Sequence, residues 1–379
     1  MRRNIYLGTF VYALQGALLL FVNSSFLSTY VPLDEVGLLY ISANLLSMLV
    51  LAWLPTLLVR YGHYHTFLTI IGVVGLALFG LATLNYPPIL LALFLLPEAL
   101  FMIVRVFLDL YLEEYSDKAH EGSNRAIFMT IINTSIALSP LLLGFLVVNN
   151  NFKLVYGFSF LATLLLGLIT ALYYHKIPDI NYEHIPIVES VKKMWRNSDI
   201  RNVFISNLVL QFFFVWMVIY SPIYLHDYVG FSWEEIGTIF FIMLLPYVFL
   251  EIPLGKIADK YLGEKELLVA GFILMGLTTS LLTFVTAKSV ILWAGLLFIT
   301  RMGAASIEIM SETYFWKKIQ LEDTEEASLF RNTKPIAYIL GPLTGSAILA
   351  FVHPSYLFII LGLIVLLSTY FPLRLHDTK

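Results

Sequence analysis

The fold is decided by residues 234–263, which read EEIGTIFFIMLLPYVFLEIPLGKIADKYLG. The stretch opens on two acidic residues and a glycine, continues through a long apolar run, and ends on a basic residue and a glycine. Residues 34–62 repeat this order as DEVGLLYISANLLSMLVLAWLPTLLVRYG, at an offset of 200 that becomes 201 with the extra Leu262. An apolar run of about 20 residues crosses the hydrocarbon core of a membrane as a helix. The chain therefore contains a repeated membrane-spanning unit.

Similar apolar runs recur along the whole chain and predict twelve transmembrane helices. They lie near residues 5–29, 36–58, 66–85, 88–112, 125–148, 154–174, 201–225, 235–255, 266–286, 289–313, 328–351 and 355–373. A third match, Ser139-Pro140 against Gly341-Pro342 at an offset of 202, extends the repeat over both halves. The sequence therefore predicts an all-α membrane protein of two pseudo-symmetric six-helix bundles, which are related by an axis along the membrane normal.

The predicted organisation has three parts. Residues 1–174 form the N-terminal six-helix bundle, 175–200 a cytoplasmic central linker, and 201–379 the C-terminal six-helix bundle. Within the linker, residues 187–196 are interpreted as a short amphipathic helix at the membrane surface. A linker that is simply solvated is the alternative.

Composition and charge exclude several classes of protein. Hydrophobic residues make up 59% of the chain and charged residues 13%, too little polar surface for a soluble domain. The net charge of −3 argues against a nucleic-acid partner. The absence of cysteine excludes disulfides and thiolate metal sites. Without phosphate-binding glycine loops or zinc-type histidine spacing, we expect no enzyme activity, metal or cofactor.

The positive charges set the predicted orientation. Of the 23 Lys and Arg residues, 17, including Lys317, fall in segments that are cytoplasmic if the N-terminus is inside. Only Lys153 and Lys288 fall in outside loops, and the remaining four lie inside spans or near their ends. Because cytoplasmic loops carry an excess of positive charge, both termini are predicted to be cytoplasmic. We expect a multi-pass protein of the cell inner membrane.

Two repeat-equivalent spans carry ionisable residues, which are costly inside a membrane and therefore suggest function. They are Glu98, Arg105 and Asp109 in the fourth span, and Arg301, Glu308 and Glu312 in the tenth. Both sets have spacings of seven and four, which place each set on one helical face. Glu98 precedes Pro140 by 42 residues and Arg301 precedes Pro342 by 41.

This depth match predicts that Glu98 pairs with Arg301, and Arg105 with Glu308, across a central cavity. Carboxylates placed in this way suit proton coupling. In the alternative, each set is satisfied within its own half, for example Arg105 by Asp109. Four further polar residues are predicted to line the cavity: Asn23, Asn207, Gln211 and Arg331. Hydrogen bonding between helices is the alternative role for the amides, and snorkelling to the surface for Arg331.

Residues 255–265, GKIADKYLGEK, resemble the signature between spans 8 and 9 of the major facilitator superfamily. Leu262 is extra, and Glu264 stands where a basic residue is usual. The resemblance implies that Gly255, Asp259, Lys260 and Gly263 form a latch at the cytoplasmic gate. A loop that only sets topology is the alternative.

The resemblance also implies a secondary transporter that works by alternating access. We expect a monomer in membrane lipid that exports small amphipathic compounds by proton-coupled antiport. Proton-coupled uptake of an organic anion or sugar-like solute is the nearest alternative. A non-transporting receptor or scaffold on the same fold is another.

Overall fold

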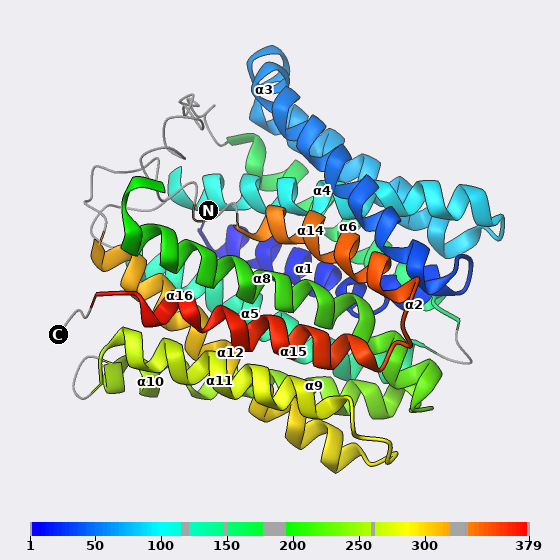
Figure 1. The fold of residues 1–379 in the computed structure, drawn as a ribbon. Helices are drawn as coiled ribbons and strands as arrows, with labels where there is room; N and C mark the ends of the chain where they lie inside the picture. Colours follow the sequence, from blue (N-terminus) through cyan, green and yellow to red (C-terminus); the bar gives the residue numbers. More distant parts are fainter. Residues whose placement is uncertain are drawn as a thin grey trace. The chain divides into compact units, whose positions relative to one another are not determined.

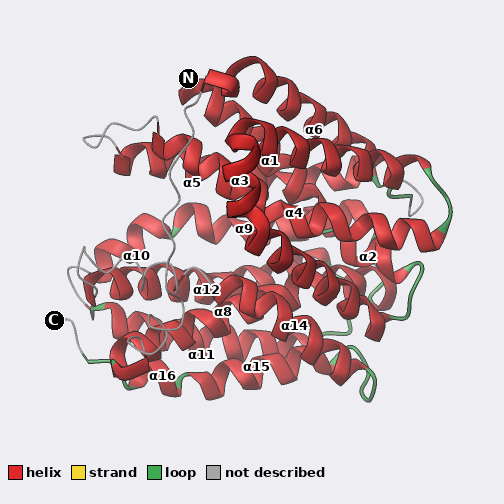
Figure 2. Cartoon of the chain, turned by 90° about the horizontal axis from the view of Figure 1, so that it is seen from above, coloured by secondary structure: helices red, strands yellow, loops and turns green. Residues whose placement is uncertain are grey.

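The computed structural model describes residues 2–114, 121–147, 151–176, 195–258, 262–318, 330 and 333–376. These residues form helices joined by short loops, and no strand occurs among them (Figure 2). The chain divides into two compact units, Met1–Glu183 (unit 1) and His184–Lys379 (unit 2). The prediction of an all-α fold is confirmed.

Unit 1 is a bundle of apolar helices. Its helices are α1 (Arg2–Leu20), α2 (Asn23–Ser28), α3 (Leu33–Thr83), α4 (Pro87–Glu114), α5 (Glu121–Leu146) and α6 (Lys153–Tyr173), followed by the 3-10 turn η1 (Tyr174–Lys176) (Figure 1). Helix α1 packs against α5 and α6, and α3 packs against α4 and α6. Aromatic rings fill the α3–α4 contact, where Phe67 stacks on Phe107 with centroids 4.9 Å apart.

Helix α3, drawn in blue in Figure 1, contains two predicted spans. Apolar stretches over Leu33–Leu54 and Thr56–Thr83 are each long enough to cross a membrane. Gly62 interrupts the helix with φ 73° and ψ 167°. This backbone conformation is open essentially to glycine alone, because a Cβ would clash there. The repeated glycine of the sequence therefore marks a backbone break.

Unit 2 repeats this construction. Its elements are α8 (Ser198–Ile223), the π-helical turn η2 (Tyr224–Tyr228), α9 (Trp233–Phe249), α10 (Glu251–Ile257), α11 (Glu264–Leu282), α12 (Val290–Lys318), α14 (Thr333–Leu349), α15 (Tyr356–Ser368) and α16 (Tyr370–Leu373). Helix α8 packs against α14, α11 against α12 and α15, and α12 against α8 and α9. The first span thus meets the fifth, and the third meets the fourth and sixth, as in unit 1.

Local chemistry explains where α9 begins and why α11 and α12 pack closely. Ser232 accepts from the amide N of Glu235 and donates its own amide N to Glu235 Oε2, a capping box that starts α9. The acidic residues of the repeat are therefore helix-start signals. Where α11 crosses α12, a Cβ on Gly303 would lie 2.7 Å from the carbonyl oxygen of Gly271. Small residues here permit the close contact that membrane helices use.

Ten described helical segments are long and apolar enough to cross a membrane. The other two predicted spans, 235–255 and 328–351, correspond to α9 and α14, whose helical stretches are 17 residues each. Helix α9 ends at Phe249, three residues after Pro246, and the chain continues as α10. The predicted amphipathic helix at 187–196 falls almost wholly outside the described residues.

Candidate transport site

Glu98 of α4 lies in a hydrogen-bonded chain inside unit 1. Its Oε2 accepts from Asn23 Nδ2 at 3.1 Å, and Asn23 Oδ1 accepts from the Tyr156 hydroxyl at 3.0 Å. Asn23 and Tyr156 are buried, whereas Glu98 is partly buried. Because the Tyr156 hydroxyl donates to the amide oxygen, the amide NH₂ is directed at the carboxylate. We call Asn23, Glu98 and Tyr156 the Glu98 cluster.

Four helices position this cluster. A two-residue turn separates α1 from α2, and Asn23 is the first residue of α2. Glu98 follows Pro97 in α4, and Tyr156 lies in α6. Phe26 packs edge-on against Tyr156 with centroids 4.9 Å apart. Tyr12 of α1 donates to the carbonyl oxygen of Phe101 at 2.7 Å, which joins α1 to α4. The cluster is thus held by aromatic packing and by a hydrogen bond between neighbouring helices.

Arg301 of α12 has different surroundings in unit 2. Its side chain is buried, 4% exposed, and its guanidinium carbon lies 5.3 Å from the Phe213 ring centroid and 5.2 Å from that of Phe214. The Tyr247 hydroxyl of α9 lies within electrostatic reach of both Arg301 and Glu308. Among the described residues, Arg301 Nε has no hydrogen-bond acceptor. We call Phe213, Phe214, Tyr247 and Arg301 the Arg301 cradle.

The remaining predicted site residues are distributed as follows. Asn207 donates to Ser311 Oγ at 3.2 Å and accepts from Thr333 Oγ1 at 2.8 Å, which joins α8, α12 and α14. Arg105 Nη2 lies 3.7 Å from Met129 Sδ. Asp109, Gln211 and Glu308 are partly buried, and Glu312 is exposed. Asp259, Lys260 and Arg331 lie outside the described residues.

The structure brings together two predicted residues that sequence reasoning kept apart. Asn23 was expected to line a cavity and Glu98 to pair with Arg301, yet Asn23 hydrogen-bonds Glu98 directly. The predicted pairs of Glu98 with Arg301 and Arg105 with Glu308 join unit 1 to unit 2 and stay predictions. The described part of the chain contains no group of three His, Asp or Glu residues suited to holding a metal ion.

At the gate motif, Gly263 adopts φ 87° and ψ 165°, almost the conformation of Gly62. Gly255 lies in α10. Glu264, which follows Gly263, is only 1% exposed and accepts a hydrogen bond from Lys317 Nζ at the end of α12. Sequence reasoning missed this ion pair, although Glu264 departs from the usual basic residue and so signals a compensating cation nearby.

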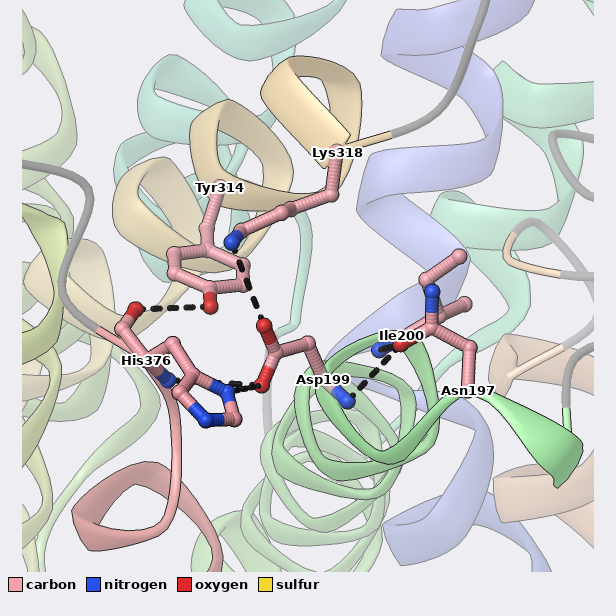
Figure 3. A network of polar contacts seen from close by, with 6 residues as sticks. All are labelled: Asn197, Asp199, Ile200, Tyr314, Lys318 and His376. Carbon is pink, nitrogen blue, oxygen red and sulfur yellow. Dashed lines mark hydrogen bonds and ion pairs between the residues drawn. The ribbon is translucent and has the colours of Figure 1, made fainter.

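A second polar network lies at the start of α8 (Figure 3). Asp199 Oδ2 lies 3.2 Å from Lys318 Nζ, and its Oδ1 lies 2.9 Å from His376 Nδ1. Tyr314 donates its hydroxyl to the carbonyl oxygen of His376 at 2.9 Å. Sequence reasoning missed this network too, because its members are far apart in the chain. It ties the first turn of α8 and the last turn of α12 to the C-terminal segment.

Two bundles of membrane helices with ionisable side chains in their interiors define a polytopic membrane protein. The chain belongs to the major facilitator superfamily, whose sequence profile, described as Major Facilitator Superfamily, matches residues 5–314 and 203–379. No curated protein sequence matches the chain.

Solved transporter structures share the fold. The POT family transporter PepTSo matches with a TM-score of 0.77 at 11% identity, covering 98% of this chain and 97% of its own. The D-xylose-proton symporter matches with a TM-score of 0.76 at 14% identity, covering 100% of this chain and 98% of its own. The nucleoside transporter NupG matches with a TM-score of 0.75 at 12% identity, covering 98% of each chain. Because the chain belongs to the major facilitator superfamily, the protein is a secondary transporter of that type and not an enzyme. Such a transporter implies a small-molecule substrate.

Proposed function

We propose that the protein exports small amphipathic compounds in exchange for protons, from the inner membrane of the cell and with both termini cytoplasmic. Glu98 carries the proton. The observation that supports this assignment is the hydrogen-bonded chain from Glu98 through Asn23 to Tyr156.

The Glu98 cluster suits a carboxyl group that changes charge. Asn23 supplies a neutral amide, whose NH₂ stabilises the carboxylate by hydrogen bonding and tolerates the protonated form. A charged carboxylate inside a membrane costs roughly 2.5–3.5 kcal/mol, so protonation lowers the cost of closing Glu98 off from water while access changes from one face to the other. The buried amide and phenol hold the acid in one place while its charge changes.

The charged residues of α4 and α12 supply the second part of the proposal. Glu98 with Arg301, and Arg105 with Glu308, pair in one access state and separate in the other. A charge swap tests this pairing: Arg105→Glu and Glu308→Arg singly lose transport, and the double variant recovers it. A double variant as inactive as either single one would contradict the pairing.

The apolar character of the substrate is inferred from aromatic side chains on α8. Phe212 and Phe214 are partly exposed, and Phe212 packs on Trp216 with ring centroids 5.2 Å apart. Such rings offer a large apolar surface to a ligand. We infer that the direction of transport is export, from these aromatic side chains of α8 and from the Gly341-Pro342 pattern of α14.

Liposomes that contain the purified protein, a luminal pH dye and a test solute provide the experiment. Antiport acidifies the lumen as solute leaves, whereas symport makes it alkaline. The panel is a lipophilic amine, an aromatic carboxylate and a sugar, with protein-free vesicles as control. Acidification with an amphipathic solute is the expected result. Alkalinisation would instead support uptake, and no proton movement with any solute would support a receptor or scaffold.

A further inference from the structure

We infer that Arg301 binds an acidic group of the substrate, so that the transported compounds are small amphipathic carboxylates. The inference rests on the proposed function for the act of transport, and it adds the chemical class of the solute. It is carried by the Arg301 cradle alone, which lies within unit 2.

The guanidinium of Arg301 is buried and, in the part of the chain that the structure describes, lacks an acceptor for one of its donors. Arg301 is 4% exposed in the middle of an apolar helix, and among the described residues its Nε has no acceptor. A buried polar group without a hydrogen bond is costly, and a charged one more so. Within the described residues, Nε is thus a buried, charged donor without an acceptor beside the Tyr247 hydroxyl, and an anion that reaches the guanidinium when Glu98 is not paired with it would supply that acceptor.

The shape of the Arg301 cradle suits a planar acid with an apolar body. Phe213 and Phe214 lie within 5.3 Å of the guanidinium carbon and offer apolar and cation–π contacts. A carboxylate matches the planar edge of a guanidinium, where two parallel N–H groups donate to its two oxygens. An acid with an apolar or aromatic body therefore satisfies the charge and the rings together. Glu308, in reach of the same Tyr247 hydroxyl, adds negative charge that weakens anion binding and so assists release.

Thermal stabilisation of the purified full chain in detergent tests the inference with three probes of one shape. Benzoate is expected to stabilise the protein in a saturable way, whereas benzamide and benzylamine are not. Arg301→Gln is expected to weaken the response to benzoate roughly 10-fold to 100-fold, the loss expected for a hydrogen-bonded charge. Arg301→Lys keeps the charge without the planar edge and is expected to lose roughly 10-fold.

Arg374→Gln is the matched control. Arg374 also stacks on an aromatic ring, 4.3 Å from the Tyr370 centroid, but it is exposed at the end of unit 2. This variant should respond to benzoate as the unmodified protein does. If Arg301→Gln does not fold, Arg301→Lys alone decides the test. Equal stabilisation by benzamide, or a full response to benzoate in a folded Arg301 variant, would overturn the inference.

Failure of this inference is distinguishable from failure of the proposed function. Luminal acidification driven by a lipophilic amine, without benzoate binding, would remove the carboxylate assignment and leave proton-coupled export intact. If benzoate binding depends on Arg301 but no solute moves protons in the vesicle assay, the anion site is supported and the proposed proton-coupled transport is contradicted.

Discussion

Helices α4 and α12 occupy equivalent places in the two halves of the protein, but they hold buried charge in different ways. In α4, Glu98 is bound through hydrogen bonds to an amide and, through it, to a phenol. In α12, the equivalent Arg301 lies against two phenyl rings. One half thus surrounds an acid with hydrogen-bonding groups, and the other surrounds a base with aromatic faces.

The difference suggests a division of labour between the two halves. A carboxyl group linked to neutral polar partners can change its protonation, whereas an arginine stays charged at any physiological pH. We therefore assign proton binding to unit 1 and recognition of the solute to unit 2.

The largest difference is expected between two buried asparagines. Asn23→Leu removes the hydrogen bond to Glu98 and should slow proton-coupled transport roughly 10-fold or more, the effect of losing a bond to a charged group. Asn207→Leu breaks bonds to the neutral Ser311 and Thr333, so it should act mainly on stability and slow transport only about 2-fold to 3-fold. Luminal pH measurements compare the two variants, and equal losses would contradict the division of labour.

The ion pair between Glu264 and Lys317 should matter next. Lys317→Met removes a cation from a carboxylate that is 1% exposed, but Lys317 itself is half exposed, so we expect a loss of about 2 kcal/mol. Thermal unfolding in detergent measures the change. The exchange Glu264→Lys with Lys317→Glu should recover most of the loss. In unit 1 the position equivalent to Glu264 is His63, which is buried and packs against the Phe107 ring. The N-terminal half therefore has an aromatic contact where the C-terminal half has the contact between Glu264 and Lys317.

The two glycine turns should respond alike. Gly62→Ala and Gly263→Ala each place a Cβ on a backbone with positive φ, and each should cost about 1–2 kcal/mol. Gly72→Ala and Gly295→Ala are helical controls whose new Cβ meets nothing within 4 Å, and they should be neutral or slightly stabilising. A large loss at one turn and none at the other would show that the repeat does not extend to these turns.

The smallest effect is expected at His376. Its side chain is 76% exposed, and its backbone N also donates to Asp199 Oδ1 at 3.3 Å, a bond that a new side chain leaves in place. His376→Gln should therefore change the unfolding free energy by less than about 0.5 kcal/mol. Lys318→Gln, which removes the other partner of Asp199, should cost more. The reverse order would show that the histidine is the main contact of the network.

Much of the fold was predictable, because an apolar run long enough to cross a membrane has few other uses. The repeat was also readable, since Gly62 and Gly263 are required by their backbone and the acidic residues start helices. The particular partners of charged side chains were not. Periodicity places Glu98 on a face of α4, but it cannot show that Asn23, 75 residues away, reaches that face.

The gate shows the same limit. Lys317 was counted among the residues that set topology, and only the packing of α11 against α12 reveals its ion pair with Glu264. Asp199 and His376 are 177 residues apart, and no motif joins them. Sequence pattern thus predicts elements and turns, whereas contacts between side chains depend on the tertiary arrangement.

The central claim is that Glu98 carries the coupled proton, and Glu98→Gln tests it most directly. Glutamine keeps the size of the side chain and an oxygen for Asn23, but it cannot be protonated at physiological pH. Proton flux and solute exchange should be measured in the same vesicles, with the solute that gives the largest signal in the panel. We predict that proton flux falls roughly 100-fold, the scale of losing a proton-transfer group, while solute exchange persists. Proton flux at the unmodified rate in Glu98→Gln would contradict the account.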